Sequence, residues 1–153
     1  KALGRYLAQA EIVFEYRADE ALIEYQQRKE YREGFLAIHD DLWSTVNLRN
    51  SIFSYQEGLF RREIPAFNEG AVREAVLNAV SHRDYRLAGS TFVRQWPTRI
   101  EIVSPGGFPP EITPENILFR QSPRNRRIAE ALAQLPMWAT MDPAISRGSR
   151  VIQ

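Results

Sequence analysis

The sequence has 153 residues, of which 44% are hydrophobic and 25% charged, and its formal net charge is +1. This composition is typical of a globular protein with one good core, and it excludes a strongly basic chain built for polyanions. Because cysteine is absent, disulfides and zinc–thiolate sites are excluded, and no apolar run is long enough to span a bilayer. We therefore expect a cytoplasmic protein with no membrane partner. The start at Lys1 leads us to expect a segment of a longer chain.

The first third of the chain predicts a hairpin followed by a helix. Residues 10–16 are rich in β-forming side chains, and residues 21–25 are a second such run, so a hairpin is expected over 10–27. Residues 33–50 show helical spacing of apolar side chains. The positions that carry this pattern are Phe35, Ile38, Leu42 and Val46, with Trp43 to one side.

The next stretch predicts a bent strand and then a long helix. Aromatic and β-branched residues surround Gly58 over residues 51–63, and Pro65 ends this run because proline lacks a backbone donor. A helix is expected over 68–82, with Asn68 as its N-cap. Its apolar face is formed by Val72, Ala75, Val76, Ala79 and Val80.

Two polar side chains on the flank of this helix form a candidate site. Glu74 and Asn78 are four residues apart, so their Cβ atoms lie about 5–6 Å from each other, one helical turn apart. A carboxylate can accept a proton from water, and an amide oxygen can bind magnesium. The same pair is also typical of the wet side of an ordinary amphipathic helix.

The remainder of the chain predicts a second hairpin, a glycine loop and a helix. Residues 91–96 and 99–103 form the clearest hairpin pattern, and the glycines and prolines of 104–110 end it. A helix is expected over 123–135 and ends before Pro136. This order of elements predicts an α+β fold, with helices on one face of a mixed sheet.

Residues 73–85 read Arg-Glu-Ala-Val-Leu-Asn-Ala-Val-Ser-His-Arg-Asp-Tyr. This stretch resembles the signature of RecG-related transcriptional regulators. Those proteins join an AlbA-type, Schlafen-like DNA-binding domain to a divergent ATPase domain of the gyrase, Hsp90, histidine-kinase and MutL class. The resemblance extends over roughly residues 55–150.

The resemblance implies an architecture and a set of ligands. It implies a two-layer nucleotide-binding sandwich, with ATP and Mg²⁺ as possible cofactors. Residues 1–50 would be the end of the upstream DNA-binding domain with a linking helix, and residues 51–153 an ATPase-like domain truncated at its C-terminus. DNA, bound through the full-length protein, and a second copy of the chain would be partners.

Carried over position by position, the resemblance also implies residue roles. Glu74 would be the general base, and Asn78 the magnesium ligand. Nucleotide-binding roles are implied for His82, Arg83, Asp84, Ser104, Gly106, Gly107, Arg124, Asn125, Arg126 and Gly148. Two positions depart from the pattern of the class, since Ser104 stands where an Asp receives adenine, and Gly148 is followed by Ser149-Arg150 rather than a second glycine.

Other functions compete with a regulatory ATPase domain. The sequence lacks the G-x-x-x-x-G-K-[ST] phosphate loop of a helicase motor, so we expect at most a weak ATPase. A non-catalytic dimerisation or DNA-contacting module with a degenerate nucleotide site is the alternative. In that case Asp84 would pair with an arginine and the hydroxyl of Tyr85 would be hydrogen-bonded. A third hypothesis, a metal hydrolase, would use His39, Asp40, Asp41 or His82.

Overall fold

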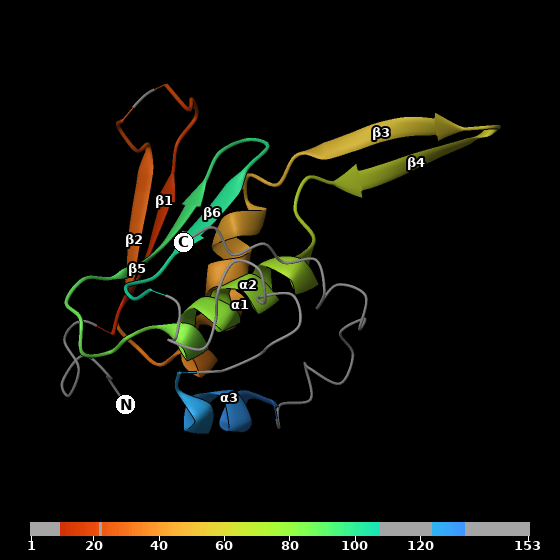
Figure 1. Cartoon of the computed structure of the whole chain (residues 1–153). Coiled ribbons are helices and arrows are strands. Elements are labelled where there is room, and N and C mark those ends of the chain that lie inside the picture. The colour runs from red at the N-terminus through yellow and green to blue at the C-terminus, as the bar shows by residue number, and fades with distance from the viewer. Residues whose placement is uncertain (1–9, 22, 108–123, 134–153) are drawn as a thin grey trace.

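The computed structural model describes residues 10–21, 23–107 and 124–133 (Figure 1). Its elements follow in the order β1 (Ile12–Tyr16), β2 (Gln27–Tyr31), α1 (Phe35–Asn47), β3 (Ile52–Glu57), β4 (Phe60–Pro65), α2 (Glu69–His82), β5 (Thr91–Gln95), β6 (Ile100–Val103) and α3 (Arg126–Ala133). This mixture of sheets and helices confirms the predicted α+β fold. None of the described helices is long and apolar enough to cross a membrane.

The main sheet has four strands in the order β2-β1-β5-β6. β1 pairs parallel with β5, while β2 and β6 pair antiparallel at the two edges, so the sheet is mixed as predicted. α1 and α2 lie against one face of this sheet (Figure 1). The core lies between these layers and contains Ile12, Phe14, Tyr31, Ile38, Leu42, Val46, Phe67, Val72, Val76, Ala79, Val93 and Ile102.

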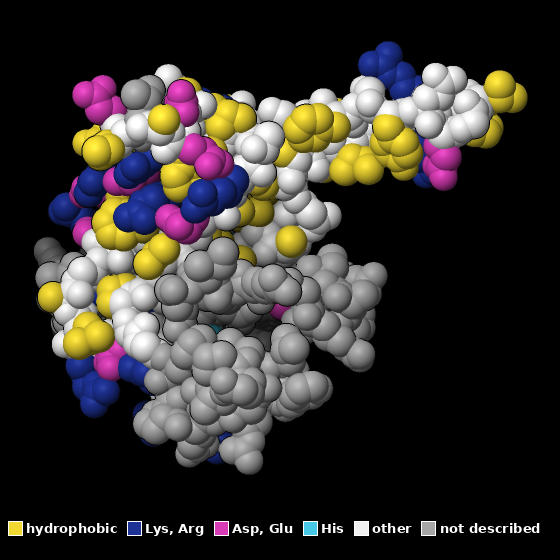
Figure 2. Space-filling model, turned by 45° about the horizontal axis from the view of Figure 1, so that its top comes forward, with side chains coloured by type: hydrophobic (Ala, Val, Ile, Leu, Met, Phe, Trp, Pro, Cys, Tyr) yellow, Lys and Arg dark blue, Asp and Glu magenta, His cyan; other side chains and the backbone are white. Residues whose placement is uncertain are grey.

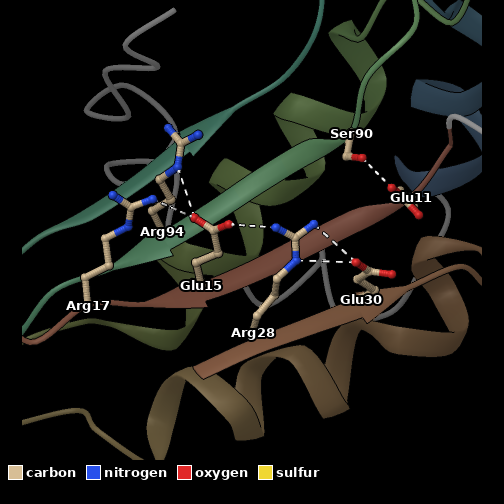
Figure 3. A network of polar contacts seen from close by, with 7 residues as sticks. All are labelled: Glu11, Glu15, Arg17, Arg28, Glu30, Ser90 and Arg94. Atoms are coloured by element: carbon tan, nitrogen blue, oxygen red, sulfur yellow. Dashed lines mark hydrogen bonds and ion pairs between the residues drawn. The ribbon is translucent and has the colours of Figure 1, made fainter. Parts of the chain in front are cut away.

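The opposite face of the sheet is polar and is stabilised by ion pairs. Phe14 points into the core, so the alternation along β1 turns Glu15 to the other face, where its side chain is nonetheless buried. Arg17, Arg28 and Arg94 approach the Glu15 carboxylate at 3.0, 3.3 and 3.5 Å (Figure 3). Figure 2 shows the basic and acidic side chains intermixed on this face. Three guanidinium groups around one carboxylate compensate its burial.

The predicted strand at 21–25 is wrong, because the second strand of the hairpin is Gln27–Tyr31. Ile23 is 86% exposed in the connection between the strands. β2 is an edge strand whose polar side chains have partners on both faces, which a hydrophobic pattern does not detect. On the helix side, Lys29 binds Asp41 at 2.5 Å and the Tyr31 hydroxyl meets Thr45 Oγ1 at 2.9 Å.

The other predicted elements lie close to where the sequence placed them. The expected helix at 33–50 is α1, and the expected helix at 68–82 is α2, whose N-cap Asn68 accepts a hydrogen bond from the Ala71 N–H at 3.1 Å. The expected bent strand at 51–63 is a complete hairpin, β3–β4, with Gly58 in its turn.

Two further predictions lie near or beyond the limits of the described residues. The described part of the helix expected at 123–135 is α3. Thr113-Pro114 also predicts a helix start, with Thr113 as N-cap and the proline at the first helical position, and this segment lies outside the described residues.

Candidate functional site

α2 has two buried faces, and the candidate pair lies on the second. Val72, Val76 and Ala79 pack into the sheet core. Glu74, Leu77 and Ser81 are also buried, and Asn78 on the same side is half-buried. The backbone carbonyl of Ser81 accepts bonds from Asn125, just before α3. Glu74 and Asn78 therefore do not lie on a solvated helix face.

Glu74 is a largely buried residue whose carboxylate has no partner in the described part of the chain. The residue is 6% exposed, and no hydrogen bond or ion pair reaches its carboxylate from the described residues. Burial raises the pKa of the Glu74 carboxyl, because removal from water disfavours the charged form. A carboxylate whose pKa is raised toward neutrality is a better proton acceptor than an ordinary surface glutamate.

Asn78 lies one helical turn beyond Glu74 and is half-buried. Within residues 10–21, 23–107 and 124–133, no other group hydrogen-bonds to its side-chain amide. Its own backbone carbonyl accepts a bond from the Ser81 hydroxyl at 3.1 Å. The Asn78 side chain therefore has both the position and the hydrogen-bonding capacity to bind a ligand next to Glu74.

The run after α2 is held by contacts within the fold. Arg83 is 2% exposed and donates to the Gly89 carbonyl at 2.5 Å and to Thr91 Oγ1 at 3.3 Å. The Tyr85 hydroxyl donates to the Val80 carbonyl at 3.0 Å. These bonds connect the end of α2 to the start of β5. The Arg83 side chain, which we predicted to bind nucleotide, points into this connection.

Asp84 is the centre of a second group of contacts at the end of α2. Arg86 and Arg124 approach its carboxylate at 2.8 and 2.5 Å. The hydrogen bonds from Arg86, together with the positive charge of Arg124, hold the pKa of Asp84 well below its usual range. Burial, and to a lesser degree the charge of Arg124, lowers the pKa of His82, so this half-buried imidazole is neutral at neutral pH.

The glycine loop packs against this same group. Gly106 has a φ of 125°, and a Cβ at this position would lie 3.1 Å from the Asp84 backbone nitrogen. The Asp84 N–H donates to the Pro105 carbonyl at 2.9 Å. Gly107 is exposed and Ser104 is half-buried. Close approach to Asp84 therefore explains Gly106 without a ligand.

The Arg-Asn segment before α3 divides into fixed and exposed side chains. Arg124 donates to the Gly107 carbonyl at 2.8 Å, and the Asn125 amide donates to the Ser81 and Arg83 carbonyls at 2.9 and 2.7 Å. Arg126 has an 84% exposed side chain and pairs with Glu130 at 2.9 Å. Gly148 lies outside the described residues.

The structure brings most of the predicted residues together at one end of α2. His82, Asp84, Gly106, Gly107, Arg124 and Asn125 form a continuous group, with Glu74 and Asn78 further along the same helix. The sequence analysis missed the structural roles of Gly89 and Thr91, which receive the Arg83 side chain. The sequence offers only an arginine directly after a helix as a signal for these roles, and its burial is seen only in the structure.

The metal-hydrolase hypothesis finds no support in the described residues. His39 Nδ1 lies 2.6 Å from Arg73, and Asp40 pairs with Arg73 at 2.7 Å. Asp41 is paired with Lys29. No group of three or more His, Asp or Glu side chains in the described part of the chain could hold a metal ion. The His39 cluster instead connects α1 to α2 through Arg73.

Comparison with known proteins gives similarities of two kinds, to a protein family and to solved structures. Residues 91–150 match the family described as "Putative ATP-dependent DNA helicase recG C-terminal". This match supports an ATPase-like domain of the RecG C-terminal kind over β5, β6 and α3, while Glu74 and Asn78 lie outside the matched range. No curated protein matches the sequence.

The fold is also similar to a solved structure. The crystal structure of the DIP2311 protein from Corynebacterium diphtheriae superposes with a TM-score of 0.74 at 27% sequence identity. The similarity covers 89% of this chain and 28% of that chain. The present chain thus spans less than a third of the length of this similar protein.

Proposed function

We propose that this chain is an ATP- and Mg²⁺-binding, ATPase-like regulatory domain of a RecG-related transcriptional regulator that contacts DNA through its full-length form. The observation that carries the proposal is the Glu74 side chain, which belongs to a residue only 6% exposed, has no partner among the described residues and lies one turn from Asn78. Partial removal of this carboxyl group from water disfavours its charged form, and a group in such an environment is a candidate for function. The family match over residues 91–150 supports the same class of domain.

The side chains of α2 fit the magnesium and phosphate side of such a site. Mg²⁺ usually keeps several waters and takes one or two protein oxygens, so the Asn78 amide oxygen would suffice as its protein ligand. When bound, Mg²⁺ would neutralise phosphate charge. Glu74 would orient a water molecule and accept its proton, and its raised pKa suits that role.

The adenine-binding side of the proposed nucleotide site departs from the pattern of the gyrase, Hsp90, histidine-kinase and MutL class. Ser104 stands where an aspartate would receive the adenine amino group, and its hydroxyl carries no charge. Arg83, Asp84 and Asn125 are occupied by contacts within the fold, so we propose that they shape the site rather than touch nucleotide. We therefore expect little discrimination between adenine and guanine nucleotides, and a slow ATPase rather than a helicase motor.

Isothermal titration calorimetry with a non-hydrolysable ATP analogue tests the proposal. The wild-type chain should bind the analogue with Mg²⁺ present, and EDTA should weaken binding. Asn78→Ala should weaken Mg²⁺-dependent binding at least about tenfold, since it removes the metal ligand. Asn47→Ala, an exposed asparagine on α1, is the matched control. Equal affinity of Asn78→Ala and wild type would contradict the site.

A second function, a non-catalytic DNA-contacting or dimerisation module, is favoured by one set of contacts. The ion pair of Asp84 and the hydrogen bond of the Tyr85 hydroxyl are the contacts expected if this run is structural. Arg126 would then contact phosphate, because its side chain is exposed. DNA affinity that falls with added salt and drops in Arg126→Ala would support this function, and salt-independent binding would contradict it.

A further inference from the structure

The hairpin β3–β4 projects away from the rest of the molecule (Figures 1 and 2). We call residues 52–65 the arm. Its base is fixed by the Ala66 N–H, which donates to the Ser51 carbonyl at 2.7 Å. The Asn50 side chain adds two bonds of 2.9 Å to the backbone of Phe67, itself a core residue. The arm therefore leaves the body in a defined direction.

Every residue of both arm strands is exposed. A two-residue turn closes the hairpin, with Gly58 at its first position and a φ of 62°, as tight hairpins prefer. An isolated two-stranded hairpin is marginally stable in water. A hairpin whose strands pack on no other described element is thus expected to gain stability from a contact beyond the described residues.

The two faces of the arm differ in chemistry. The cross-strand pairs Phe53↔Ile64, Tyr55↔Arg62 and Glu57↔Phe60 share one face, because paired residues point to the same side. The pairs Ile52↔Pro65, Ser54↔Glu63 and Gln56↔Arg61 share the other, so the apolar side chains of that face are confined to the base of the arm. Large apolar side chains therefore line the first face, which we call the apolar face. Figure 2 shows hydrophobic side chains in a row along the arm.

The exposed apolar area is large for a segment of this size. Phe53, Tyr55, Phe60 and Ile64 are 52%, 44%, 74% and 51% exposed, and Leu59 in the turn is 96% exposed. With side-chain areas on the order of 200 Å², these five side chains together expose roughly 600 Å². This lies at the upper end of the largest apolar patch of a typical monomer, about 300–600 Å², and is the greater part of the ~800 Å² that each partner buries in a standard protein interface.

The charges of the arm identify the kind of partner. Arg61 and Arg62 are balanced by Glu57 and Glu63, and Arg62 is paired with Glu57 at 2.6 Å. A neutral surface with acidic groups on it does not attract a polyanion. A second copy of the arm carries the same apolar face, and on each copy Glu57 neutralises Arg62, so the two faces meet without a net charge.

We infer that the arm is a homodimerisation element, in which the apolar faces of two copies pack on each other around a two-fold axis. An axis near the Tyr55↔Arg62 pair places the Phe60 end of each arm over the Phe53↔Ile64 end of the other. Aromatic side chains then meet aliphatic ones at both ends. This contact is independent of the nucleotide site, and its test does not depend on ATP binding.

Analytical ultracentrifugation of the whole chain tests the inference. Wild type should show a concentration-dependent dimer between about 1 µM and about 200 µM. Phe60→Glu combined with Ile64→Glu should weaken the dimer at least ~30-fold, because charges would be buried in an apolar contact. Ser54→Glu combined with Gln56→Glu adds the same charge to the opposite face and should change the dimer less than about threefold.

Cross-linking supplies an independent readout. The sequence has no cysteine, so Tyr55→Cys and Gln56→Cys each introduce a single thiol. A short bis-maleimide reagent should join two copies of Tyr55→Cys, and it should leave Gln56→Cys largely unjoined. The inference is overturned by a monomer at all concentrations, by equal effects of the two double variants, or by a monomer that binds DNA or lipid vesicles through the apolar face.

Discussion

At the scale of single residues, two carboxyl groups of one short segment have opposite environments. Glu74 is buried without a described partner, and its pKa is raised. Asp84 is also buried but is surrounded by Arg86 and Arg124, and its pKa is lowered. This difference agrees with the proposed role of Glu74 in proton transfer and with a structural role of Asp84.

Replacement of Glu74 by glutamine should change the pH dependence of stability. Because burial raises the pKa of Glu74, the folded state holds the proton to a higher pH than the unfolded state does. The free energy of unfolding of wild type should therefore fall as pH rises from the ordinary glutamate pKa through the raised value, and Glu74→Gln should lack this loss. Urea unfolding at a series of pH values measures both curves, and parallel curves would contradict the burial argument.

The same variant should lose ATP hydrolysis while keeping nucleotide binding. A positioned general base contributes about 10²- to 10⁴-fold to a rate, so Glu74→Gln should lower any ATPase rate of the chain at least about 100-fold. Phosphate release measures the rate, and calorimetry with the ATP analogue verifies binding. An unchanged rate would exclude Glu74 as the base.

Asp84→Asn should destabilise the fold at neutral pH. The lowered pKa of Asp84 means that its stabilising contribution is present above the ordinary aspartate pKa and is lost as pH falls through the folded-state value. The melting temperature of Asp84→Asn should thus lie below that of wild type at pH 7, and the gap should narrow in acid. The exposed Asp19→Asn is the control, and a constant gap at every pH would refute the ion-pair account.

At the scale of elements, the sequence correctly predicted the helices and strands whose hydrophobic pattern reflects burial of one face. α1 and α2 have helical apolar spacing, and β5–β6 is bounded by clear turn residues, so these positions were correct. β2 was misplaced because, Tyr31 apart, its side chains are polar and are stabilised by individual ion pairs and hydrogen bonds. A pattern of hydrophobicity contains no information about such partners.

Removal of the α2 cap should cost a defined amount of stability. The Asn68 side chain satisfies the Ala71 N–H in the first turn of the helix. Asn68→Ala should lower the free energy of unfolding by about 1 kcal/mol, whereas Asn68→Asp, which caps equally well, should preserve it. Chemical denaturation monitored by circular dichroism measures both. Equal losses in the two variants would show that the cap is not the cause.

At the scale of the whole molecule, the pairing of distant segments lay beyond the sequence. β1 pairs parallel with β5, so Ile12 lies next to Thr91. Local periodicity predicts that each strand exists, but not which strand it joins. The proposed division into residues 1–50 and 51–153 stays a prediction, although segments on both sides of it share one sheet and one core in the described residues.

As with the fold, the sequence predicted the local part of the site but not the contacts between distant segments. Helical spacing alone placed Glu74 beside Asn78, because both lie on one element. The alternative hypothesis expected an arginine to pair with Asp84, and Arg124 does so, but the sequence did not identify which arginine. It also did not reveal that Arg83 donates to the Gly89 carbonyl and Asn125 to the Arg83 carbonyl, since these contacts join separate segments. Side chains whose partners are remote in sequence are easily mistaken for ligand-binding groups.

A substitution in the shared core should affect the entire fold. Phe14 on β1 is fully buried among residues from both sides of residue 50. Phe14→Ala should lower the free energy of unfolding by about 3–5 kcal/mol, and Leu48→Ala, at a 75% exposed position, should change it by less than about 0.5 kcal/mol. A single unfolding transition that shifts as a whole is expected. Two separate transitions would show that the segments fold independently.

An amide-resolved NMR titration with a non-hydrolysable ATP analogue and Mg²⁺ tests the nucleotide site most directly. The proposed function predicts shifts that cluster on Glu74, Asn78 and residues 104–107 and that disappear in Asn78→Ala. An absence of shifts at millimolar ligand would contradict nucleotide binding by this chain. The DNA-contacting or dimerisation function would then take its place.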